Sequence, residues 1–273
     1  MERQGKMICI GKCLTLKDTM TQAFNIFLIV MAAVAVVVFI ALLFVDAGYG
    51  KFYNPKWGPA LDNHIGWFLM EVPVFIAMLV LWWYSDRRTD PSRLVFLLLF
   101  EIHYFHRSFI FPVQIRGRSK MPWAIVIMGA AFNTLNAFMQ GGWIFWVSPR
   151  DMYGSEWFLK APFIVGTLLF AWGMVVNISS DATIRSLRKP GDTAHYLPKG
   201  GMFRYVTSAN YFGEFVEWVG FAVLTWSWAG AVFALWTFAN LAPRAASIYE
   251  RYKREFPDQL DTRRVKRMIP LIW

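Results

Sequence analysis

Residues Phe24 to Val45 read FNIFLIVMAAVAVVVFIALLFV, a stretch without one charged side chain. A helix needs about 20 mostly apolar residues to cross a bilayer, so this stretch predicts a membrane span. The basic residues before it and the small residues after it resemble a secretory signal. The apolar core of such a signal has only roughly 7–15 residues, however. We therefore expect a first span that stays in the protein rather than a cleaved leader.

The same pattern recurs along the chain. Further apolar stretches predict spans at residues 65–84, 94–113, 123–147, 158–178, 205–226 and 228–242. A charged segment with a helical pattern follows from Arg244 to Phe256. No internal repeat or linker divides the chain. The sequence thus predicts an all-α, multi-pass membrane protein: about seven transmembrane helices in one bundle, a single domain over residues 1–273, and a C-terminal cytoplasmic tail.

Composition supports this class and excludes others. Hydrophobic residues make up 56% of the chain and charged residues 17%, yet the net charge is +10. A soluble domain has roughly 25% charged residues. With the C-terminus in the cytoplasm, 19 of the 28 Lys and Arg lie on that side, as the positive-inside rule requires. The two cysteines, Cys9 and Cys13, are too few for a four-ligand zinc site.

Polar residues inside the predicted spans are the main functional signal, because polar and ionisable groups in hydrocarbon are costly. They recur at helical spacing on four spans, and Glu71 stands alone on a fifth. The four sets are Asn133, Asn136 and Gln140; Asn177 and Asp181; Asn210, Glu214 and Glu217; and His103 to Arg107. A single set of this kind usually joins two helices. Several together indicate a polar cavity inside the bundle.

The residues alone leave the occupant of that cavity open. Arginines near the cytoplasmic helix ends suit a phosphorylated nucleotide, or equally anionic lipid headgroups. The carboxylates suit a cation or an arginine partner. Rossmann, P-loop and serine-hydrolase motifs are absent. His103 and His106 with Glu101 allow a metal, although a hydrogen-bonded aromatic cluster is the simpler interpretation, and we predict no metal.

Several strings, in this order, closely resemble the steroid 5α-reductase (3-oxo-5α-steroid 4-dehydrogenase) family. They are HYFHR at 103–107, NISSD at 177–181, LRKPG at 187–191, PKGGMF at 198–203, SANYFGE at 208–214, EW at 217–218 and IPLIW at 269–273. The resemblance extends from about Trp67 to the C-terminus. Its last hundred residues are the most specific part.

The resemblance implies a membrane enzyme that uses NADPH to reduce the 4,5 double bond of a 3-keto-4-ene steroid. It assigns Glu71 and Tyr104 to the 3-keto oxygen as catalytic residues, with Met70 and Phe132 beside the substrate. NADPH would be bound by Asn177, Asp181, Arg188, Tyr196, Asn210, Glu214, Arg244, Tyr252 and Arg118.

The implied chemistry suits these residue types. An enone accepts hydride only if its carbonyl oxygen is polarised, and Tyr104 can donate a hydrogen bond to it. A Glu71 buried in hydrocarbon is expected to carry a proton and to donate as well. The structural alternatives for Glu71 are an ion pair with Arg107 and a contact beside Pro73. Arg188 or Lys189 would meet the 2′-phosphate of NADPH.

Two departures from the family leave the substrate open. Met70 stands where steroid-reducing members carry glutamine, and Ser247–Tyr249 where they are rich in histidine. Alternatives are a reductase of another enone or enoyl lipid, a methyltransferase of the isoprenylcysteine carboxyl type, and a transporter using Glu214 and Glu217. The expected partners are a steroid and membrane lipids, with no nucleic acid. The expected location is the endoplasmic reticulum membrane in a eukaryote or the inner membrane in a bacterium.

Overall fold

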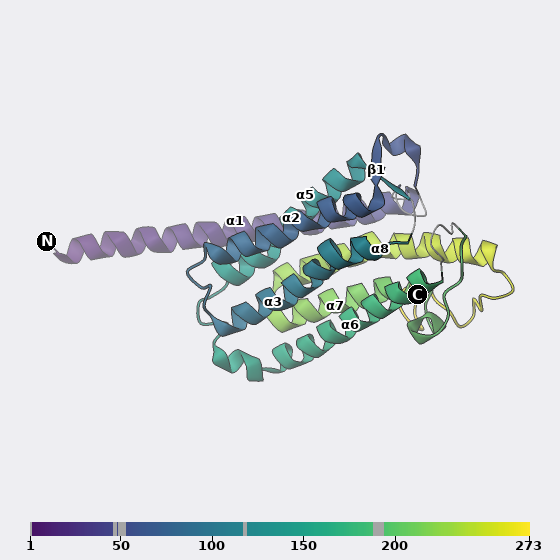
Figure 1. Ribbon diagram of the computed structural model, residues 1–273. Coiled ribbons are helices and arrows are strands. Elements are labelled where there is room, and N and C mark those ends of the chain that lie inside the picture. Colours follow the sequence, from purple (N-terminus) through teal and green to yellow (C-terminus); the bar gives the residue numbers. More distant parts are fainter. Residues whose placement is uncertain (1, 46–47, 49–52, 117–118, 188–193) are drawn as a thin grey trace.

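A computed structural model describes residues 2–45, 48, 53–116, 119–187 and 194–273, with side chains from Lys17 onward. Long helices run side by side along one axis, and the first projects beyond the others at the N-terminus (Figure 1). Cys9 and Cys13 lie among the residues whose side chains are not described. The helices are α1 (Glu2–Phe44), α2 (Asn63–Trp83), α3 (Pro91–Phe105), α4 (Phe111–Gln114), α5 (Trp123–Gly141), α6 (Ala161–Ser186), α7 (Ala209–Thr225) and α8 (Trp228–Glu255).

The helix positions follow the predicted spans closely, and the all-α membrane class is confirmed. Two predicted spans contain a π-helical part: His106–Ile110 joins α3 to α4, and Gly142–Val147 extends α5. Among the described residues, five helical segments are long and apolar enough to cross a membrane. They are Lys17–Phe44, Asn63–Trp83, Pro91–Gln114, Trp123–Val147 and Ala161–Ser186. Helices α7 and α8 occupy the other two predicted positions, so a total of seven spans stays a prediction.

Two differences from the sequence expectation bear on the site. Helix α6 continues to Ser186, about two turns past the predicted end of its span, because polar residues there bond within the protein. The last predicted span and the charged tail form one continuous helix, α8, which passes through Pro243. In addition, two short strands escaped the pattern: β1 (Ala60–Asp62) pairs antiparallel with β2 (Lys120–Pro122).

Helix ends are set by local hydrogen bonds. Asp62 caps α2, where its Oδ1 accepts from the His64 backbone nitrogen at 2.8 Å. Ser227 caps α8 by accepting from the Gly230 nitrogen at 3.0 Å. The tight turn between α7 and α8 is completed by Trp226 in a left-handed conformation, with φ of 45°. The Ser227 cap and the turn at Trp226 connect α7 and α8 as an antiparallel hairpin.

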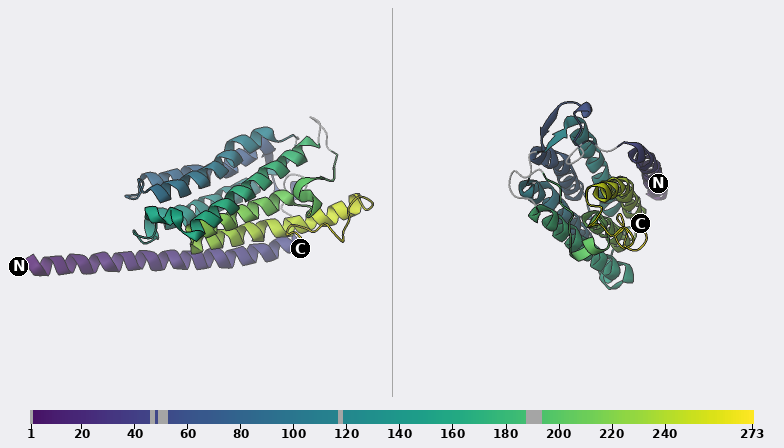
Figure 2. Two further views of the ribbon diagram at one scale, coloured as in Figure 1. Left: turned by 90° about the horizontal axis from the view of Figure 1, so that it is seen from below. Right: turned by 90° about the vertical axis from the view of Figure 1, so that its right-hand side faces the viewer.

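The helices pack in pairs: α2 with α5, α6 with α7, and α8 with both α7 and α1. Figure 2 shows α1 lying along α8. The indole nitrogen of Trp236 on α8 donates to the Met31 carbonyl of α1 at 2.8 Å. The C-terminal segment turns back, and its Lys266 and Arg267 carbonyls accept from the Thr207 and Ser208 nitrogens before α7.

Helices α6 and α7 approach so closely that their backbones touch. Gly166 and Gly173 on α6 face Gly213 and Gly220 on α7, each pair seven residues apart. A Cβ atom on Gly173 would lie 2.3 Å from the Glu217 nitrogen, and one on Gly213 would lie 2.4 Å from the Asn177 nitrogen. Small residues of this kind allow close helix packing in membranes. The glycine seam, as we call these four residues, brings the polar residues of α6 and α7 together.

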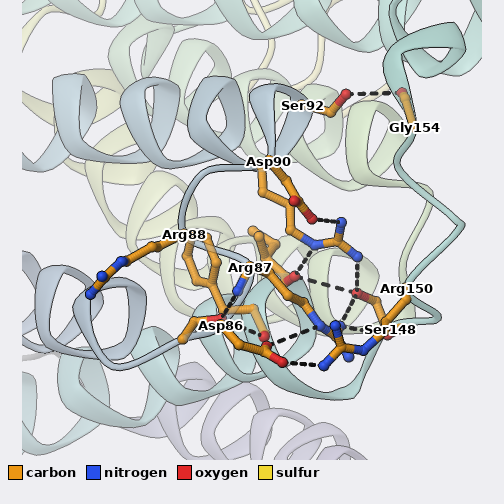
Figure 3. Close-up of polar contacts among 12 residues, drawn as sticks. Asp86, Arg87, Arg88, Asp90, Ser92, Ser148, Arg150 and Gly154 are labelled. Carbon is orange, nitrogen blue, oxygen red and sulfur yellow. Dashed lines mark hydrogen bonds and ion pairs between the residues drawn. The ribbon is translucent and has the colours of Figure 1, made fainter.

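The end of the bundle opposite the C-terminus is held by an arginine cluster between the α2–α3 loop and the segment before α6 (Figure 3). Arg93 is fully buried and donates to Asp90, to Ser148 and to the Ile144 and Pro149 carbonyls. Arg87 donates to the Ser148 carbonyl at 2.6 Å, and Arg150 pairs with Asp86. These contacts join two loops and lie away from the sites described next.

Candidate functional site

Glu71 on α2 and Tyr104 on α3 are both buried, and α5 contacts both. Asn133 Nδ2 donates to Glu71 Oε2 at 2.9 Å and to the Met70 carbonyl at 2.8 Å. Asn136 Nδ2 donates to the Tyr104 hydroxyl at 2.8 Å. The two predicted catalytic residues therefore share one supporting helix.

Arg107 lies beside this pair. Its Nη2 is 3.9 Å from Glu71 Oε1, which is an ion-pair distance but longer than a hydrogen bond. The guanidinium stacks on Trp67 and Phe111, with 4.6 and 4.7 Å to the ring centroids. The Glu71–Arg107 contact that the sequence allowed is thus present as a long ion pair.

Aromatic rings form a wall next to Tyr104. Trp218 of α7 is 5.7 Å from the Tyr104 ring and 4.6 Å from the Phe233 ring, between centroids. Phe132 of α5 lies 4.5 Å from Trp236 and 6.1 Å from Phe233. Phe132 thus lies in this wall, whereas Met70 packs in a separate apolar cluster with Met121, Ile125 and Val126.

A buried histidine–carboxylate pair lies behind Tyr104. His103 Nδ1 is 2.8 Å from Glu217 Oε1, and both residues are buried. Glu217 Oε2 has no hydrogen-bond partner among the described residues. The sequence had suggested arginine or a cation for Glu217. Helix α3 supplies a histidine instead, so the expected hydrogen-bonded aromatic cluster around His103 is confirmed.

A second polar group lies where α6 and α7 end toward the C-terminal side of the bundle. Asn177 Nδ2 donates to the Asn210 carbonyl at 3.0 Å, and Asn210 Nδ2 donates to Asp181 Oδ1 at 2.9 Å. Glu214 lies half-buried one turn further along α7. We call these residues of α6 and α7, together with Glu71 and Tyr104, the polar region.

The remaining predicted cofactor residues come from α8 and the segment before α7. Arg244 Nε donates to the Tyr211 hydroxyl at 2.7 Å, and Tyr252 is buried against Ile248 and Leu260. Tyr196 is 41% exposed, while its neighbour His195 faces α8. His195 Nδ1 lies 3.0 Å from Glu255 Oε1 and 2.9 Å from Arg251 Nη2.

The contacts of Glu255 make this a charged clasp between the segment at residues 194–199 and the end of α8. Partial burial raises the pKa of the Glu255 carboxyl, but hydrogen bonds from Arg251 and His195 hold that pKa below its ordinary value. The clasp fixes the segment that carries Tyr196. Arg118 and Arg188, two predicted cofactor residues, lie outside the described residues.

Two arginines that the sequence reasoning left out lie in this polar region. Arg116 Nη1 is 3.4 Å from the Arg185 carbonyl, and the two guanidinium groups repel each other electrostatically. Arg185 Nη1 is buried and has no hydrogen-bond partner among the described residues. Arg185 also acts electrostatically on Asp181. Two neighbouring guanidinium groups, one of which has a buried nitrogen without a partner among the described residues, are suited to bind an anion. The signal was available, since Arg185 is four residues after Asp181 on the same helix face.

Across the residues that the structure describes, no group of three or more His, Cys, Asp or Glu is placed to hold a metal ion. Glu101, which the sequence analysis grouped with His103 and His106, has two buried carboxylate oxygens without a hydrogen-bond partner among the described residues. The polar region is therefore built from amides, carboxyls, a phenol and guanidinium groups.

Comparison with known proteins gives consistent matches. A family model described as 3-oxo-5-alpha-steroid 4-dehydrogenase matches residues 119–273. The chain is 36% identical over 240 residues to a steroid 5-alpha-reductase (DET2) of Arabidopsis thaliana, covering 86% of this chain and 90% of the relative. It is 39% identical over 245 residues to 3-oxo-5-alpha-steroid 4-dehydrogenase 1 of Mus musculus, covering 87% and 92%.

These matches cover somewhat more of the chain than the resemblance in the sequence, which extended from about Trp67 to the C-terminus. They cover most of the chain and most of each relative. Of the strings that indicated the family, HYFHR, NISSD, SANYFGE and EW lie on or at the ends of α3, α6 and α7. The chain therefore belongs to the 3-oxo-5-alpha-steroid 4-dehydrogenase family of membrane oxidoreductases.

Proposed function

We propose that this protein reduces the 4,5 double bond of 3-keto-4-ene steroids with NADPH, giving 5α-reduced 3-ketosteroids. The observation that carries the proposal is the placement of Glu71 and Tyr104. Both are buried, each is hydrogen-bonded to an amide of α5, and the aromatic wall of Phe132, Trp218 and Phe233 lies alongside. The names of the relatives support the same substrate class.

Tyr104 and Glu71 would polarise the substrate's 3-keto oxygen. When bound, NADPH supplies the hydride that carbon 5 receives. The π electrons of the enone then move to the 3-keto oxygen, and the tyrosine hydroxyl and a protonated Glu71 carboxyl stabilise the charge that develops there. The resulting enolate would take a proton from water at carbon 4, so that the 3-ketone re-forms with a saturated 4,5 bond. The aromatic wall keeps water away from these groups and so strengthens their hydrogen bonds.

The polar region at the C-terminal end suits a phosphorylated nucleotide. The unused, buried Arg185 Nη1 beside Arg116 offers donors and positive charge for a phosphate group. The amides of Asn177 and Asn210 and the Asp181 carboxylate can address hydroxyl and amide groups of a nucleotide. Glu214 would join this end to the Glu71–Tyr104 pair. Arg244, Tyr196 and Tyr252 would close the nucleotide site from α8 and from the segment before α7.

The orientation in the membrane follows from the same assignment. A charged nucleotide has to enter from water, so we place the C-terminal end of the bundle, with its basic residues, in the cytoplasm. A steroid can reach the aromatic wall laterally from the bilayer. In a eukaryote the membrane would be that of the endoplasmic reticulum, and in a bacterium the inner membrane.

Met70 favours a test on more than one substrate. Its side chain lies in the apolar cluster with Met121 and Ile125, so it offers no polar group beside Glu71. A longer, less polar enone such as a polyprenal is therefore the second candidate for the same chemistry.

The test uses purified protein in detergent with NADPH and a panel of testosterone, progesterone and a polyprenal. We expect loss of reduced-nicotinamide absorbance together with a 5α-reduced steroid product. Tyr104→Phe and Glu71→Gln should each lower kcat about 10²–10³-fold, while the Kd for NADPH stays close to wild type. Absence of any reduced steroid would refute the proposal, and reduction of the polyprenal alone would move it to the second candidate. Loss of NADPH binding alone in either variant would refute the residue roles.

A further inference from the structure

The polar stripe of α5 has a role that its helical spacing alone does not reveal. Asn133, Asn136 and Gln140 are all buried on one face of the helix. Gln140 Nε2 donates to the Ala229 carbonyl of α8 at 3.0 Å, which is an ordinary helix–helix contact. The two asparagines instead donate to the two predicted catalytic side chains.

The Asn133 amide is fixed in orientation by a backbone group. Its Nδ2 donates to the Met70 carbonyl, which can only accept, so the amide nitrogen has to point toward α2. The same nitrogen donates its second hydrogen to Glu71 Oε2. In a protonated Glu71 carboxyl, this bond makes Oε2 the accepting oxygen. The acid hydrogen then belongs on Oε1, which lies 3.9 Å from Arg107 Nη2, beyond hydrogen-bonding distance.

Asn136 does the same for the phenol. Its amide donates into the oxygen of Tyr104, so the tyrosine's own hydrogen is not used in that bond. Both residues are buried, at 0% and 3% exposure, where no water competes for the contact. A donor at the phenol oxygen also stabilises the negative charge that grows there as the hydroxyl donates.

We propose that Asn133 and Asn136 are positioning residues that keep the acid hydrogens of Glu71 and Tyr104 free for the substrate's carbonyl oxygen. The inference rests on the proposed roles of Glu71 and Tyr104 and adds to them the groups that orient them. Asn133 donates to Glu71 Oε2 and Asn136 donates to the Tyr104 hydroxyl oxygen, so neither bond uses the acid hydrogen of its partner. In this proposal each asparagine acts through its partner, because the hydrogen bonds of its amide nitrogen go to Glu71 and the Met70 carbonyl or to Tyr104.

The test is a pair of double-mutant cycles, measured on the full chain in detergent. Asn136→Leu should lower kcat for the steroid about 10- to 100-fold, the range for a lost hydrogen bond to a charged group, with little change in KM. In a Tyr104→Phe background, Asn136→Leu should have almost no further effect. Asn133→Leu should behave in the same way toward Glu71→Gln. Gln140→Leu is the matched control, since it removes a buried amide from the same stripe, and we expect it to leave kcat close to wild type.

NADPH binding and thermal unfolding show whether each variant is folded. If Asn136→Leu does not fold, Asn136→Ser replaces it, because a serine hydroxyl is too short to reach the phenol. Equal losses from Asn136→Leu in the wild-type and the Tyr104→Phe backgrounds would overturn the inference, as would a wild-type kcat in the folded asparagine variants. Failure of the proposed function looks different, because wild-type protein would then reduce no enone or Tyr104→Phe would keep full activity.

Discussion

Gly173 belongs to the glycine seam, where an added methyl group would meet backbone rather than a movable side chain, and it lies one turn before Asn177. A Cβ atom there would lie 2.3 Å from the Glu217 nitrogen and 2.7 Å from the Gly213 oxygen, whereas ordinary contact begins at 3.4 Å. Gly173→Ala therefore has to move α6 and α7 apart by about 1 Å. Overpacking of this kind costs about 1–3 kcal/mol.

The separation should also reach the end of the bundle where we propose that NADPH binds. Asn177, one turn after Gly173, donates to the Asn210 carbonyl at 3.0 Å. A shift of about 1 Å takes that contact beyond hydrogen-bonding distance. Loss of about 1 kcal/mol of support for these residues should raise the Kd for NADPH about fivefold.

The assay is thermal unfolding and NADPH titration of purified protein in detergent. Gly141→Ala is the matched control, because its new Cβ would meet side chains rather than backbone: Leu81 Cδ1 at 2.8 Å, Met78 Sδ at 2.9 Å and Leu81 Cβ at 3.3 Å. Since alanine favours a helix over glycine by about 1 kcal/mol, this control should be neutral or stabilising. A Gly173→Ala protein with wild-type melting and wild-type Kd would refute the close contact of α6 and α7. An equal loss in Gly141→Ala would refute its special position.

Three further predictions concern other contacts. Arg93→Met should lower the free energy of unfolding by about 2 kcal/mol or more, because it leaves the Ile144 and Pro149 carbonyls without their donor. Its kcat/KM should stay at the wild-type value, and a large loss of activity in the folded variant would contradict that. Arg185→Met should raise the Kd for NADPH about tenfold, measured by titration, and weaken the salt dependence of binding; an unchanged Kd would exclude Arg185 from the phosphate site. Because the pKa of Glu255 lies below its ordinary value of 4.5, its contribution to stability should be present above that pH and lost as the pH falls through the lower, folded-state pKa. The melting difference between wild type and Glu255→Gln should therefore vanish in acid, and a difference that grows there would contradict the clasp.

The sequence predicted the helices well because an apolar stretch of bilayer length leaves few alternatives. Phe24–Val45 and Trp123–Val147 show this, since the C-terminal end of each predicted span falls within one residue of the structure. The end of α6 lies about two turns beyond the predicted span, which was ended before the polar stretch that includes Asp181. Its carboxylate is instead bonded by Asn210 of α7, and no pattern along a single helix shows such a partner.

The candidate site was predicted to the same extent: the pattern along one helix was correct, but the partners on other helices were not foreseen. Helical spacing correctly placed Asn133, Asn136 and Gln140 on one face of α5, but it could not show that two of them contact Glu71 and Tyr104. Those partners come from α2 and α3, and hydropathy does not fix how these helices are rotated. The His103–Glu217 pair escaped prediction for the same reason. The glycine seam had a visible signal, four glycines at intervals of seven on neighbouring spans, which the sequence reasoning did not use.

The central claim is that a hydride passes from NADPH to carbon 5 of an enone held by Glu71 and Tyr104. The most direct measurement is mass spectrometry of the product formed with NADPH in which deuterium replaces both hydrogens at C4 of the nicotinamide ring. We predict one deuterium at carbon 5 of the 5α-reduced steroid in wild-type protein, and almost no product from Tyr104→Phe under the same conditions. A reduced product without that deuterium, or with the label at another carbon, would contradict the account.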